Sequence, residues 1–576
     1  MKKTGAWLAR YALEQIGIRY TFGIPGVHNT ELYDELNASD TITPILVTHE
    51  GGGAFMADAV SRLSPSTGCL VVVPAAGVTH AASGIGEAFL DGIPMMILCG
   101  GVRTDLPFKY QLHQLDQQAL MAPLCKKTYK ITRHEDVIPT LYEAHNVAIS
   151  GEPGPVFVEI PVNIQLLTGE VSQLPQYQRW QPQSPPSQLI EQAAQLIVSA
   201  QKPCIFAGWG AKDAATELIE LAERLGAPVS TTLQGLSVFP GDHPLHTGFG
   251  FGPAAVPAAR ESFKDCDCLI AIGTRFGEIA TGSYGITPPA ALIHIDINPD
   301  ALNANYPAKV AIAADARLAI RALLTALPDT PLAAGILTQR QHQIKKLKKT
   351  YVDEWLNHDS GDRVNPAIFF KALRTVLPRD STVVVDDGNH TFLTAELLPI
   401  YQPGGFISPT DFNCMGYSVP AAIGAKLVRP DTPVVTIVGD GCFAMTCMEI
   451  ATAVQQGLGV VYFVFNDGEL SQIAQAQEIP YNRKACTVLP AINFEGIARG
   501  VGAEYLALPD NRAVEGAIRE ALNLSAQGRP VIVDVRIDYS KRSAFTQGIV
   551  KTNLQRFNLG TKVRLVARAI GRRITG

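Results

Sequence analysis

Short apolar runs alternate with amphipathic segments along most of the chain. In the first third, such runs occupy residues 45–47, 69–73, 95–98 and 156–160, and the segments between them have helical spacing. Continuous apolar runs separated by helices are typical of strands that are buried on both faces of a parallel sheet. The pattern therefore predicts an α/β domain, with a doubly wound parallel sheet, over residues 1–180.

A break in this pattern follows the first domain. Residues 176–188, QYQRWQPQSPPSQ, are rich in proline and polar side chains and lack periodicity, which indicates a linker. Apolar runs then return at 203–207, 269–272 and 292–296. They predict a central Rossmann-like domain over residues 190–335.

A third set of apolar runs begins after a basic, helix-favouring segment at 339–351, which we expect to be a connecting helix. These runs predict another α/β domain over residues 360–540. The expected fold is thus three doubly wound parallel-sheet domains, the last with strands at residues 383–385, 434–438, 460–465 and 531–535.

Composition and charge narrow the classes of function. The 576 residues are 47% apolar, and 48 basic against 53 acidic residues leave a formal charge of −5. That balance provides no overall field for nucleic acid, so small molecules are the expected partners. The ten cysteines are scattered without zinc or disulfide spacing, and no apolar run approaches the roughly 18 residues of a membrane span. We expect a soluble, cytoplasmic protein.

Residues 541–576 form a basic tail that contains no acidic side chain. Such a helix can lie on an anionic membrane, or it can pack against protein as an arm or a lid over the site. We favour packing because the apolar stripe lacks aromatic anchors, and peripheral membrane contact remains the alternative. The stripe begins at Leu559 and continues with Val563, Val566, Ala567, Ile570 and Ile574.

Two consecutive strand ends in the third domain carry oxygen ligands. The run 434–438 leads into Gly439, Asp440 and Gly441, followed by a helix-like stretch at 445–456, and the next run ends in Asn466 and Gly468. An isolated Gly-Asp-Gly is most often a tight turn before a helix. Here the asparagine lies 26 positions after Asp440, at the neighbouring strand end. We therefore predict that Asp440, Asn466 and Gly468 bind Mg²⁺ against a diphosphate.

With this pair of motifs, the chain resembles the thiamine-diphosphate-dependent enzymes of the acetolactate synthase, pyruvate oxidase and benzaldehyde lyase group, up to about Ser540. The resemblance implies thiamine diphosphate and Mg²⁺ as cofactors. It also identifies Glu50 as the acid that protonates the aminopyrimidine ring, so that the cofactor can lose its thiazolium proton. On its own, Glu50 would be an ordinary first-turn helix carboxylate.

The resemblance assigns other cofactor contacts residue by residue. Met415 matches the apolar prop beneath the bent cofactor, although plain core packing would also explain a methionine. The remaining cofactor-binding residues implied are Gly388, Asn389 and His390 at the far end of the diphosphate, and Gly439, Gly441, Cys442 and Leu470 around the metal ligands.

On the substrate side, the resemblance points to loop residues. His28 in GIPGVHN is the candidate acid–base, and His80 is expected to face the cofactor, although the PAAGVTH segment departs from the family's usual glycine and proline. Either His113 or Gln114 is expected to point inward. Gln472, with Ala476 near it, replaces the Met-Val and Gln-Trp pairs of biosynthetic acetolactate synthases, so we expect a roomier, more polar pocket.

The resemblance implies decarboxylation of a 2-oxo acid, with pyruvate expected, and carboligation to an aldehyde, ketone or oxo acid. The alternatives are a flavin-linked pyruvate oxidase and an acyloin lyase of the benzaldehyde lyase type. Stretches around Arg275 and Asp296 resemble flavin-binding members, but a surface arginine at a strand end explains them equally well, so FAD stays open. The family pairs its domains across subunits, so we expect a homodimer or homotetramer with sites at the interface. A relative that binds the cofactor without turnover is disfavoured because Glu50, Asp440 and Asn466 are retained.

Overall fold

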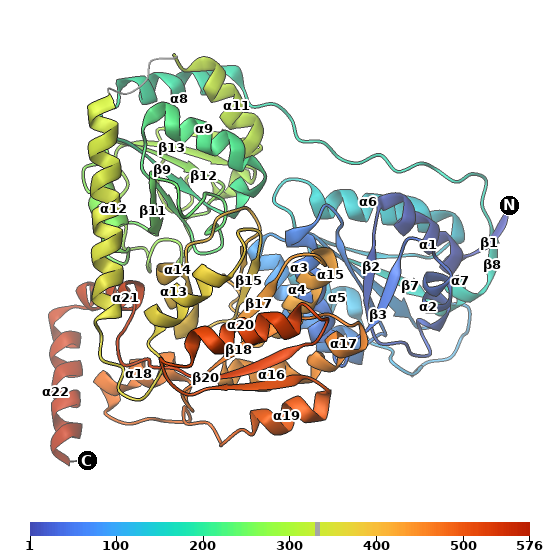
Figure 1. The fold of residues 1–576 in the computed structure, drawn as a ribbon. Coiled ribbons are helices and arrows are strands. Elements are labelled where there is room, and N and C mark those ends of the chain that lie inside the picture. The colour runs from blue at the N-terminus through green and yellow to red at the C-terminus, as the bar shows by residue number, and fades with distance from the viewer. Residues whose placement is uncertain (329–333, 576) are drawn as a thin grey trace.

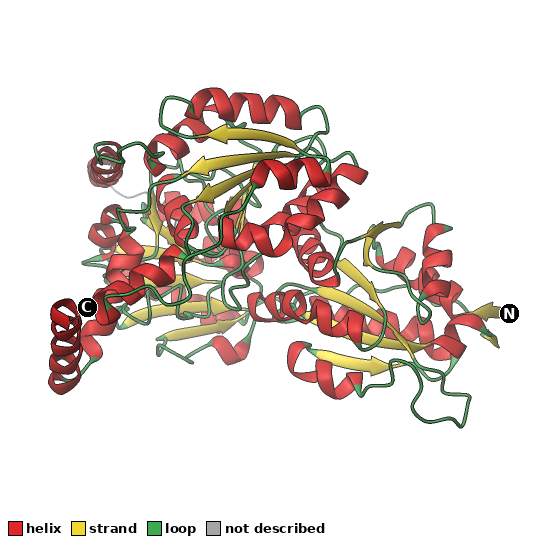
Figure 2. Cartoon of the chain, turned by 90° about the horizontal axis from the view of Figure 1, so that it is seen from below, coloured by secondary structure: helices red, strands yellow, loops and turns green. Residues whose placement is uncertain are grey.

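The chain folds into three α/β domains, each built on a six-stranded sheet (Figure 1). The computed structural model describes residues 1–328 and 334–575. All strand pairs within the three sheets are parallel. Helices lie on both faces of the strands (Figure 2). The predicted fold class is confirmed, because long apolar runs can be buried on both faces only in such a layered arrangement.

The N-terminal domain has the sheet order β3-β2-β4-β5-β7-β6. Its first helix begins where the Thr4 side chain accepts the Trp7 amide, and it ends at Gly17, which has a φ of 90°. The strands are β2 (Tyr20–Gly23), β3 (Thr43–Leu46), β4 (Gly68–Val72), β5 (Met95–Gly101), β6 (Lys127–Lys130) and β7 (Pro155–Pro161). The helices are α1 (Gly5–Ile16), α2 (Thr30–Asn37), α3 (Glu50–Leu63), α4 (Ala76–Asp91), α5 (Gln117–Met121), α6 (Val137–Ile149) and α7 (Val162–Leu166).

The central domain has the order β11-β10-β9-β12-β13-β14. Its strands are β9 (Pro203–Ala207), β10 (Val229–Thr231), β11 (His246–Phe249), β12 (Cys268–Ile272), β13 (Ala291–Asp296) and β14 (Val310–Ala313). Its helices are α8 (Ser187–Ser199), α9 (Ala215–Leu225), α10 (Pro257–Phe263) and α11 (Ala316–Ala326). The expected basic connecting helix is α12 (Ala334–Leu356).

The C-terminal domain has the order β16-β15-β17-β18-β20-β19. Its strands are β15 (Thr382–Val385), β16 (Phe406–Ile407), β17 (Val434–Gly439), β18 (Val461–Asn466), β19 (Glu504–Leu508) and β20 (Val531–Arg536). Its helices are α13 (Pro366–Val376), α14 (Asn389–Leu397), α15 (Ser418–Val428), α16 (Asp440–Thr446), α17 (Ile450–Gln455), α18 (Ser471–Tyr481), α19 (Phe494–Val501) and α20 (Val514–Ser525).

One helix differs from the sequence prediction. We expected a continuous helix over 445–456, but α16 begins at Asp440 itself, and a short 3-10 turn at Cys447–Glu449 separates it from α17. The earlier start places Asp440 at the first turn, where its carboxylate also meets the helix dipole.

The N- and C-terminal domains share one apolar core. Helix α3 packs against α15, and side chains such as Phe55 and Tyr417 belong to the same buried cluster. The helices approach so closely that a Cβ at Gly424 would lie 2.3 Å from the Met56 carbonyl oxygen. Only glycine fits at this crossing, so the two catalytic domains of one chain form a single packed body.

The linker begins and ends earlier than predicted, and it is slightly longer. Residues 171–186 contain no helix or strand, but α8 already begins at Ser187. Within this segment, Tyr142 donates to the Pro175 carbonyl, and Asn146 accepts the Trp180 amide, so the first part lies along α6. Figure 1 shows the segment running as an extended strap from the N-terminal to the central domain.

The basic tail consists of α21 (Ala544–Arg556) and α22 (Leu559–Thr575). Phe545 of α21 is buried, with its ring stacked on Phe392 at 4.3 Å between centroids. In contrast, the stripe of α22 is exposed, from 53% at Ile570 to 78% at Ile574. The expected burial of this stripe is therefore not found within the described chain. None of the described helices is long and apolar enough to cross a membrane.

Candidate functional site

Most of the predicted cofactor residues line one cavity at the carboxyl edge of the C-terminal sheet, although Asn466 and Gly468 are not among its lining residues. Strands β17 and β18 are neighbours, so Asp440 and Asn466 lie at adjacent strand ends. The cavity lining contains Gly388, Asn389, His390, Met415, Gly439, Asp440, Gly441, Cys442, Leu470 and Gln472. The sequence prediction thus brought together residues from four separate segments.

Asp440 is the buried carboxylate of this edge. One oxygen accepts the Gly441 amide at 2.8 Å, and the other accepts the Gly468 amide at 2.7 Å. Burial raises the pKa of Asp440, although these amide bonds oppose the shift. A buried carboxylate with a raised pKa is favoured to gain a cation, because a positive charge would stabilise the ionised form.

Asn466 is oriented by a neighbouring strand. Its amide nitrogen donates to Asp534 of β20 at 2.9 Å, and its amide oxygen has no hydrogen bond among the described residues. Gly468 has a φ of 78° and no atom within 4 Å of a would-be Cβ. Carboxylate, amide and carbonyl oxygens are the ligands that Mg²⁺ prefers, so the residue set fits a magnesium diphosphate.

The N-terminal end of α14 forms the other side of the cavity. Gly388 has a φ of 151°, and a Cβ there would lie 2.6 Å from the His390 ring. His390 is fully enclosed, and burial lowers its pKa to about 3, so the ring is neutral. Its Nε2 is buried without a partner among the described residues. An amide-lined helix start with an unpartnered imidazole nitrogen is suited to a phosphate group.

Met415, Leu470 and Cys442 define the apolar part of the cavity. A Cβ at Gly441 would lie 2.7 Å from Leu470 and 3.8 Å from the Met415 methyl, so both side chains converge on this glycine. Asp386 holds the turn after Met415 by accepting the Gly416 and Ser418 amides at 2.8 and 2.7 Å. The Cys442 thiol donates to the Asp387 carbonyl at 3.2 Å, so this thiol is engaged by the protein. The cavity therefore has a polar end and an apolar end.

Gln472 stands in the first turn of α18, over the same cavity. Its side-chain oxygen is buried and has no hydrogen-bond partner among the described residues. A buried acceptor without a partner costs free energy unless a ligand or water supplies a donor. This geometry is consistent with a contact to a bound molecule.

Glu50 and His80 meet in the N-terminal domain. Glu50 is the first residue of α3 and is buried, while His80 lies on α4 and donates or accepts through Nδ1 at 3.0 Å from the Glu50 carboxylate. The His49 ring stacks on His80 at 4.8 Å between centroids. His80 therefore reaches Glu50 despite the unusual segment before it, where Ala75 adopts a φ of 56°.

His28 and His113 form a second pair. Their ring centroids are 5.2 Å apart, and His113 Nδ1 donates to the Pro74 carbonyl at 2.8 Å. Burial, and the nearby His113 ring, lower the pKa of His28. Gln114 is exposed and accepts the Gln111 amide within its own loop. Of the two alternatives at this segment, His113 is therefore the one that points inward.

Gln117 is a residue that sequence reasoning missed. Its side-chain oxygen accepts the Ala75 amide at 3.1 Å and the Cys99 thiol at 3.3 Å, and so it supports the strained turn beside Gly77. Nothing in the residue type or its neighbours in the sequence distinguishes it from an exposed glutamine.

Two carboxylates that were not predicted from the sequence connect the N- and C-terminal domains. Glu449, from the turn before α17, accepts the Thr48 and His49 amides at 3.1 and 2.9 Å, directly before Glu50. In return, Glu87 of α4 accepts the Cys414 amide at 2.9 Å, directly before Met415. Each domain thus positions the functional loop of the other.

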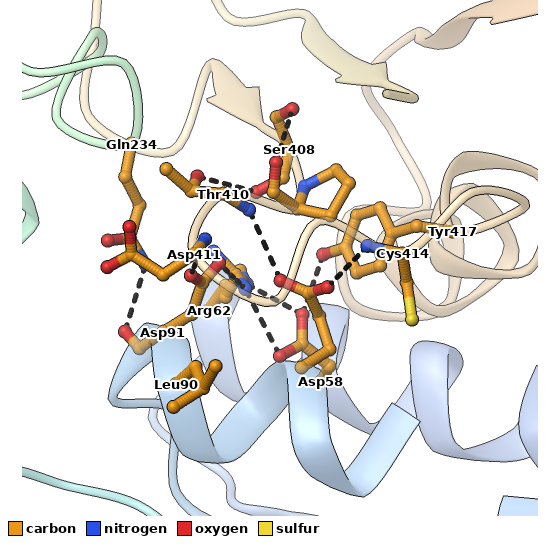
Figure 3. A network of polar contacts seen from close by, with 12 residues as sticks. Asp58, Arg62, Leu90, Asp91, Gln234, Ser408, Thr410, Asp411, Cys414 and Tyr417 are labelled. Atoms are coloured by element: carbon orange, nitrogen blue, oxygen red, sulfur yellow. Dashed lines mark hydrogen bonds and ion pairs between the residues drawn. The ribbon is translucent and has the colours of Figure 1, made fainter. Parts of the chain in front are cut away.

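A buried ionic cluster backs this arrangement. Arg62 of α3 pairs with Asp58 at 2.6 Å and with Asp91 at 2.8 Å, and Tyr417 donates to Asp58 (Figure 3). Asp91 also accepts the amide of Asp411 (Figure 3). Since both acids satisfy the same buried guanidinium, the loop that carries Met415 has a fixed position against α4.

Glu50 is not in the cavity of its own chain. Among the described residues, the cavity lining comes only from residues 387–539. The single chain therefore holds Glu50 and the predicted diphosphate ligands in two separate places, which are called half-sites below.

Comparison with known proteins decides the family. Three models match: the N-terminal TPP binding domain of thiamine pyrophosphate enzymes over residues 2–120, the central domain over 190–323, and the C-terminal TPP binding domain over 386–535. A probable acetolactate synthase large subunit of Methanocaldococcus jannaschii is 32% identical, over 92% of this chain and 90% of its own length.

The chain belongs to the thiamine pyrophosphate enzyme family. The acetolactate synthase large subunit of Corynebacterium glutamicum is 31% identical over 92% of this chain and 86% of that protein. The isozyme 3 large subunit of Escherichia coli is 28% identical over 93% of this chain and 95% of that protein. The resemblance drawn from the motifs is therefore confirmed.

Arg275 and Asp296 belong to the two stretches that resemble flavin-binding members. Arg275 follows β12, and its guanidinium donates to Glu152 of the N-terminal domain and to Asp411 of the C-terminal domain. Asp296, at the end of β13, is buried, which raises its pKa to about 6. The arginine expected to meet a nucleotide is already paired with two carboxylates.

Proposed function

We propose that the protein is a thiamine-diphosphate-dependent carboligase, which decarboxylates a 2-oxo acid and joins the acyl unit to an aldehyde, ketone or oxo acid. Pyruvate is the expected donor. One observation carries the proposal: the chain holds both Glu50, hydrogen-bonded to His80, and a separate cavity lined by Asp440, with Asn466 at the neighbouring strand end. The similarity to acetolactate synthase large subunits supports the same reaction class.

Each half-site has a distinct task in this proposal. Asp440, the Asn466 amide oxygen and the Gly468 carbonyl would hold Mg²⁺, and the start of α14 would hold the diphosphate. Bound thiamine diphosphate supplies the electron sink that decarboxylation requires. Glu50 holds a proton at its carboxyl oxygen for the aminopyrimidine nitrogen, and Met415 and Leu470 exclude water from the apolar end of the cavity.

His28 would move protons on the substrate oxygen. Its lowered pKa keeps the ring neutral near pH 7, so it can accept a proton, and His113 beside it is anchored through Pro74. Gln472 offers a buried oxygen that has no hydrogen-bond partner among the described residues, which suits an acceptor with a hydroxyl or amide donor. Product analysis after incubation with pyruvate and a panel of carbonyl acceptors tests the proposal. Absence of both carbon dioxide release and ligation products would contradict it.

The histidine pair supports a second candidate. The rings of His28 and His113 lie close enough to serve both directions of a proton transfer, as cleavage of an acyloin would need. If the protein is an acyloin lyase, it should split a 2-hydroxy ketone faster than it decarboxylates pyruvate. Parallel assays with both substrates distinguish the two reactions.

We also propose that two copies complete each active site. The support is the separation of the half-sites, together with apolar side chains exposed beside His113, such as Phe108 at 70% and Tyr110 at 96%. Mixing Glu50→Gln protein with Asp440→Ala protein should restore activity, because a mixed dimer contains one intact site. If mixing restores nothing while sedimentation shows mixed dimers, the sites are not shared. A homotetramer would be a dimer of such dimers.

The ten cysteines are all unpaired, which supports a reducing compartment, and we therefore propose a cytoplasmic location.

A further inference from the structure

The central domain contains the crevice where a doubly wound sheet ordinarily takes a nucleotide. The chain forms β9 first, adds β10 on one side and later β12 on the other, so the sheet order reverses between β9 and β12. Ligands of open α/β sheets bind outside the carboxyl ends of the strands at such a switch point. In this protein, the loops after β9 and β12 carry Trp209 and Arg275 at that place.

The two loops are in direct contact. The Gly208 amide donates to the Ile272 carbonyl at 2.9 Å, and the Gly210 amide donates to the Gly273 carbonyl at 3.1 Å. A Cβ at Gly210 would lie only 2.7 Å from the Gly273 Cα. Here the glycines bring two protein backbones together. The Gly208 and Gly210 amides already donate to carbonyls of the facing segment, so they are not presented to a phosphate.

Trp209 projects from this loop into the N-terminal domain. Its indole is 9% exposed and belongs to the same buried cluster as the core of α3 and α15. The Arg62 guanidinium lies 5.6 Å from the ring centroid, and the Lys212 ammonium lies 5.3 Å from it. The ring is therefore a contact between domains, stabilised by burial and by two cations.

Arg275 makes the second contact between domains. It donates to Glu152 at 2.6 Å, to the Leu90 carbonyl, and to Asp411 of the loop that leads to Met415. Figure 3 shows Leu90, Asp91 and Asp411 gathered at this corner, with Gln234 of the central domain also donating to the Asp91 carbonyl. One central-domain arginine thus joins the other two domains.

The charge around Arg275 is wrong for a dinucleotide. Its single positive charge is matched by Glu152 and Asp411, and Asp91 and Asp296 line the same cleft. Glu152 is also held by the Asn298 amide. A flavin diphosphate would bring negative charge beside four carboxylates and would have to break the existing pairs.

We propose that this cleft does not accept a flavin dinucleotide, and that Trp209 and Arg275 instead clasp the central domain to the two catalytic domains. The protein then carries out its carboligation without flavin, and electrons do not leave the site through this cleft. The inference stands on contacts in the central domain and goes beyond the proposed reaction.

A flavin titration of the unmodified protein is the direct test. The protein, saturated with thiamine diphosphate and Mg²⁺, should release no flavin on denaturation, and added FAD should change neither flavin fluorescence anisotropy nor the melting temperature. A flavin-containing enzyme treated in the same way is the positive control. Flavin that copurifies, or a melting temperature that rises with FAD, would overturn the proposal.

Two variants distinguish a structural contact of Arg275 between domains from a contact of Arg275 with flavin. Arg275→Gln should lower the melting temperature by about 2–4 °C without FAD, because a half-buried contact that joins three domains is lost. Arg260→Gln, an exposed arginine of the same domain, should leave it unchanged. If Arg275→Gln leaves the melting temperature unchanged but abolishes an FAD-induced rise, Arg275 is a flavin ligand. Carboligation is assayed separately, so its absence would count against the proposed function and not against the clasp.

Discussion

At the scale of single residues, the site depends on groups whose protonation or hydrogen bonding is set by a neighbour. Glu50 has His80 at 3.0 Å, and its own loop is held by Glu449. Asp440 and His390 are buried polar groups that line the cavity. Burying such groups costs free energy unless a ligand satisfies their hydrogen bonds. Substitution of a site residue should therefore change ligand binding or proton transfer.

Glu50→Gln should keep cofactor bound and suppress its activation, because the amide preserves shape but cannot transfer a proton. We expect exchange of the thiazolium proton to slow by about a hundredfold or more, the usual scale of general acid–base catalysis. Exchange is followed by proton NMR, with Glu31→Gln on the exposed face of α2 as the control. An exchange rate equal to that of the unmodified protein would show that Glu50 is not the relay.

Asp440→Ala should weaken Mg²⁺ and thiamine diphosphate binding together, by at least about tenfold, since one charged oxygen leaves a compact site. Calorimetric titration measures both affinities. Asp510→Ala, at an exposed turn, is a suitable control. Unchanged affinities in the Asp440 variant would mean that the metal binds elsewhere.

The same cavity predicts a pH dependence. Burial raises the pKa of Asp440, raises that of Asp467 to about 6 and raises that of Asp387 to about 7. A carboxyl whose folded-state pKa is raised makes the free protein less stable as pH rises through that pKa. The melting temperature without ligands should therefore fall from about pH 4, near the ordinary pKa of aspartate, to about pH 7. Mg²⁺ with thiamine diphosphate should remove most of this fall. If these ligands raise the melting temperature equally at the low and the high end of this pH range, the prediction is contradicted.

His28→Ala should slow ligation more than decarboxylation, because proton transfer to the substrate oxygen is needed chiefly in the second half-reaction. A loss of about a hundredfold in ligation is the expected size. Carbon dioxide release and product formation are measured in one assay, with His134→Ala on the domain surface as the control. Equal losses in both half-reactions would remove the specific role given to His28.

At the scale of elements, the tail divides into a packed and an unpacked helix. Phe545 of α21 stacks on Phe392, and the Phe545 and Ala544 amides donate to Glu396. In contrast, α22 contacts the body chiefly through Arg568 and Arg572 over the ring of Tyr481, at the end of α18. Contacts of this exposed kind contribute little, about 0.5–1 kcal/mol each.

Truncation should separate the two helices. A chain ending at Phe557 should melt close to the full-length protein, whereas a chain ending at Ser543 should melt several degrees lower, because buried Phe545 is lost. Since α18 carries Gln472, we expect removal of α22 to lower turnover modestly.

Full-length protein should stay in the supernatant with anionic liposomes, because the stripe lacks aromatic anchors. Sedimentation with liposomes would establish a membrane contact instead.

The sequence predicted the elements, and which strand ends lie together, better than it predicted the contacts between domains. Apolar runs located β4, β5, β17 and β18 because strands buried on both faces leave a continuous apolar pattern. Asp440 and Asn466 were found because strand ends determine which residues meet. Glu449 and Glu87 were missed because they act across domains, 401 and 327 positions from Thr48 and Cys414 respectively. No local pattern records such distant partners. The exposed face of α22 was also missed, since periodicity shows an apolar stripe but not what lies against it.

At the scale of the whole molecule, three domains are joined by surfaces more than by chain connections. Helices α3 and α15 share a core. Glu449 accepts an amide of the N-terminal domain, and Glu87 accepts an amide of the C-terminal domain. Trp209 and Arg275 reach from the central domain to the other domains. All of these contacts are made between side chains or backbone groups that are far apart in sequence. The fold should therefore depend little on the strap of residues 171–186.

That strap can be read as a natural boundary for cutting the gene in two. Its last part, residues 181–186, contains no helix or strand, and the first part rests on α6 of the N-terminal domain. Two polypeptides, residues 1–183 and 184–576, should copurify when they are coexpressed with an affinity tag on one of them. Alanine at Trp209 should weaken this association. Independent partners of this kind would make the amino-terminal fragment exchangeable, so that half-sites from different homologues could be paired without building a single fused chain.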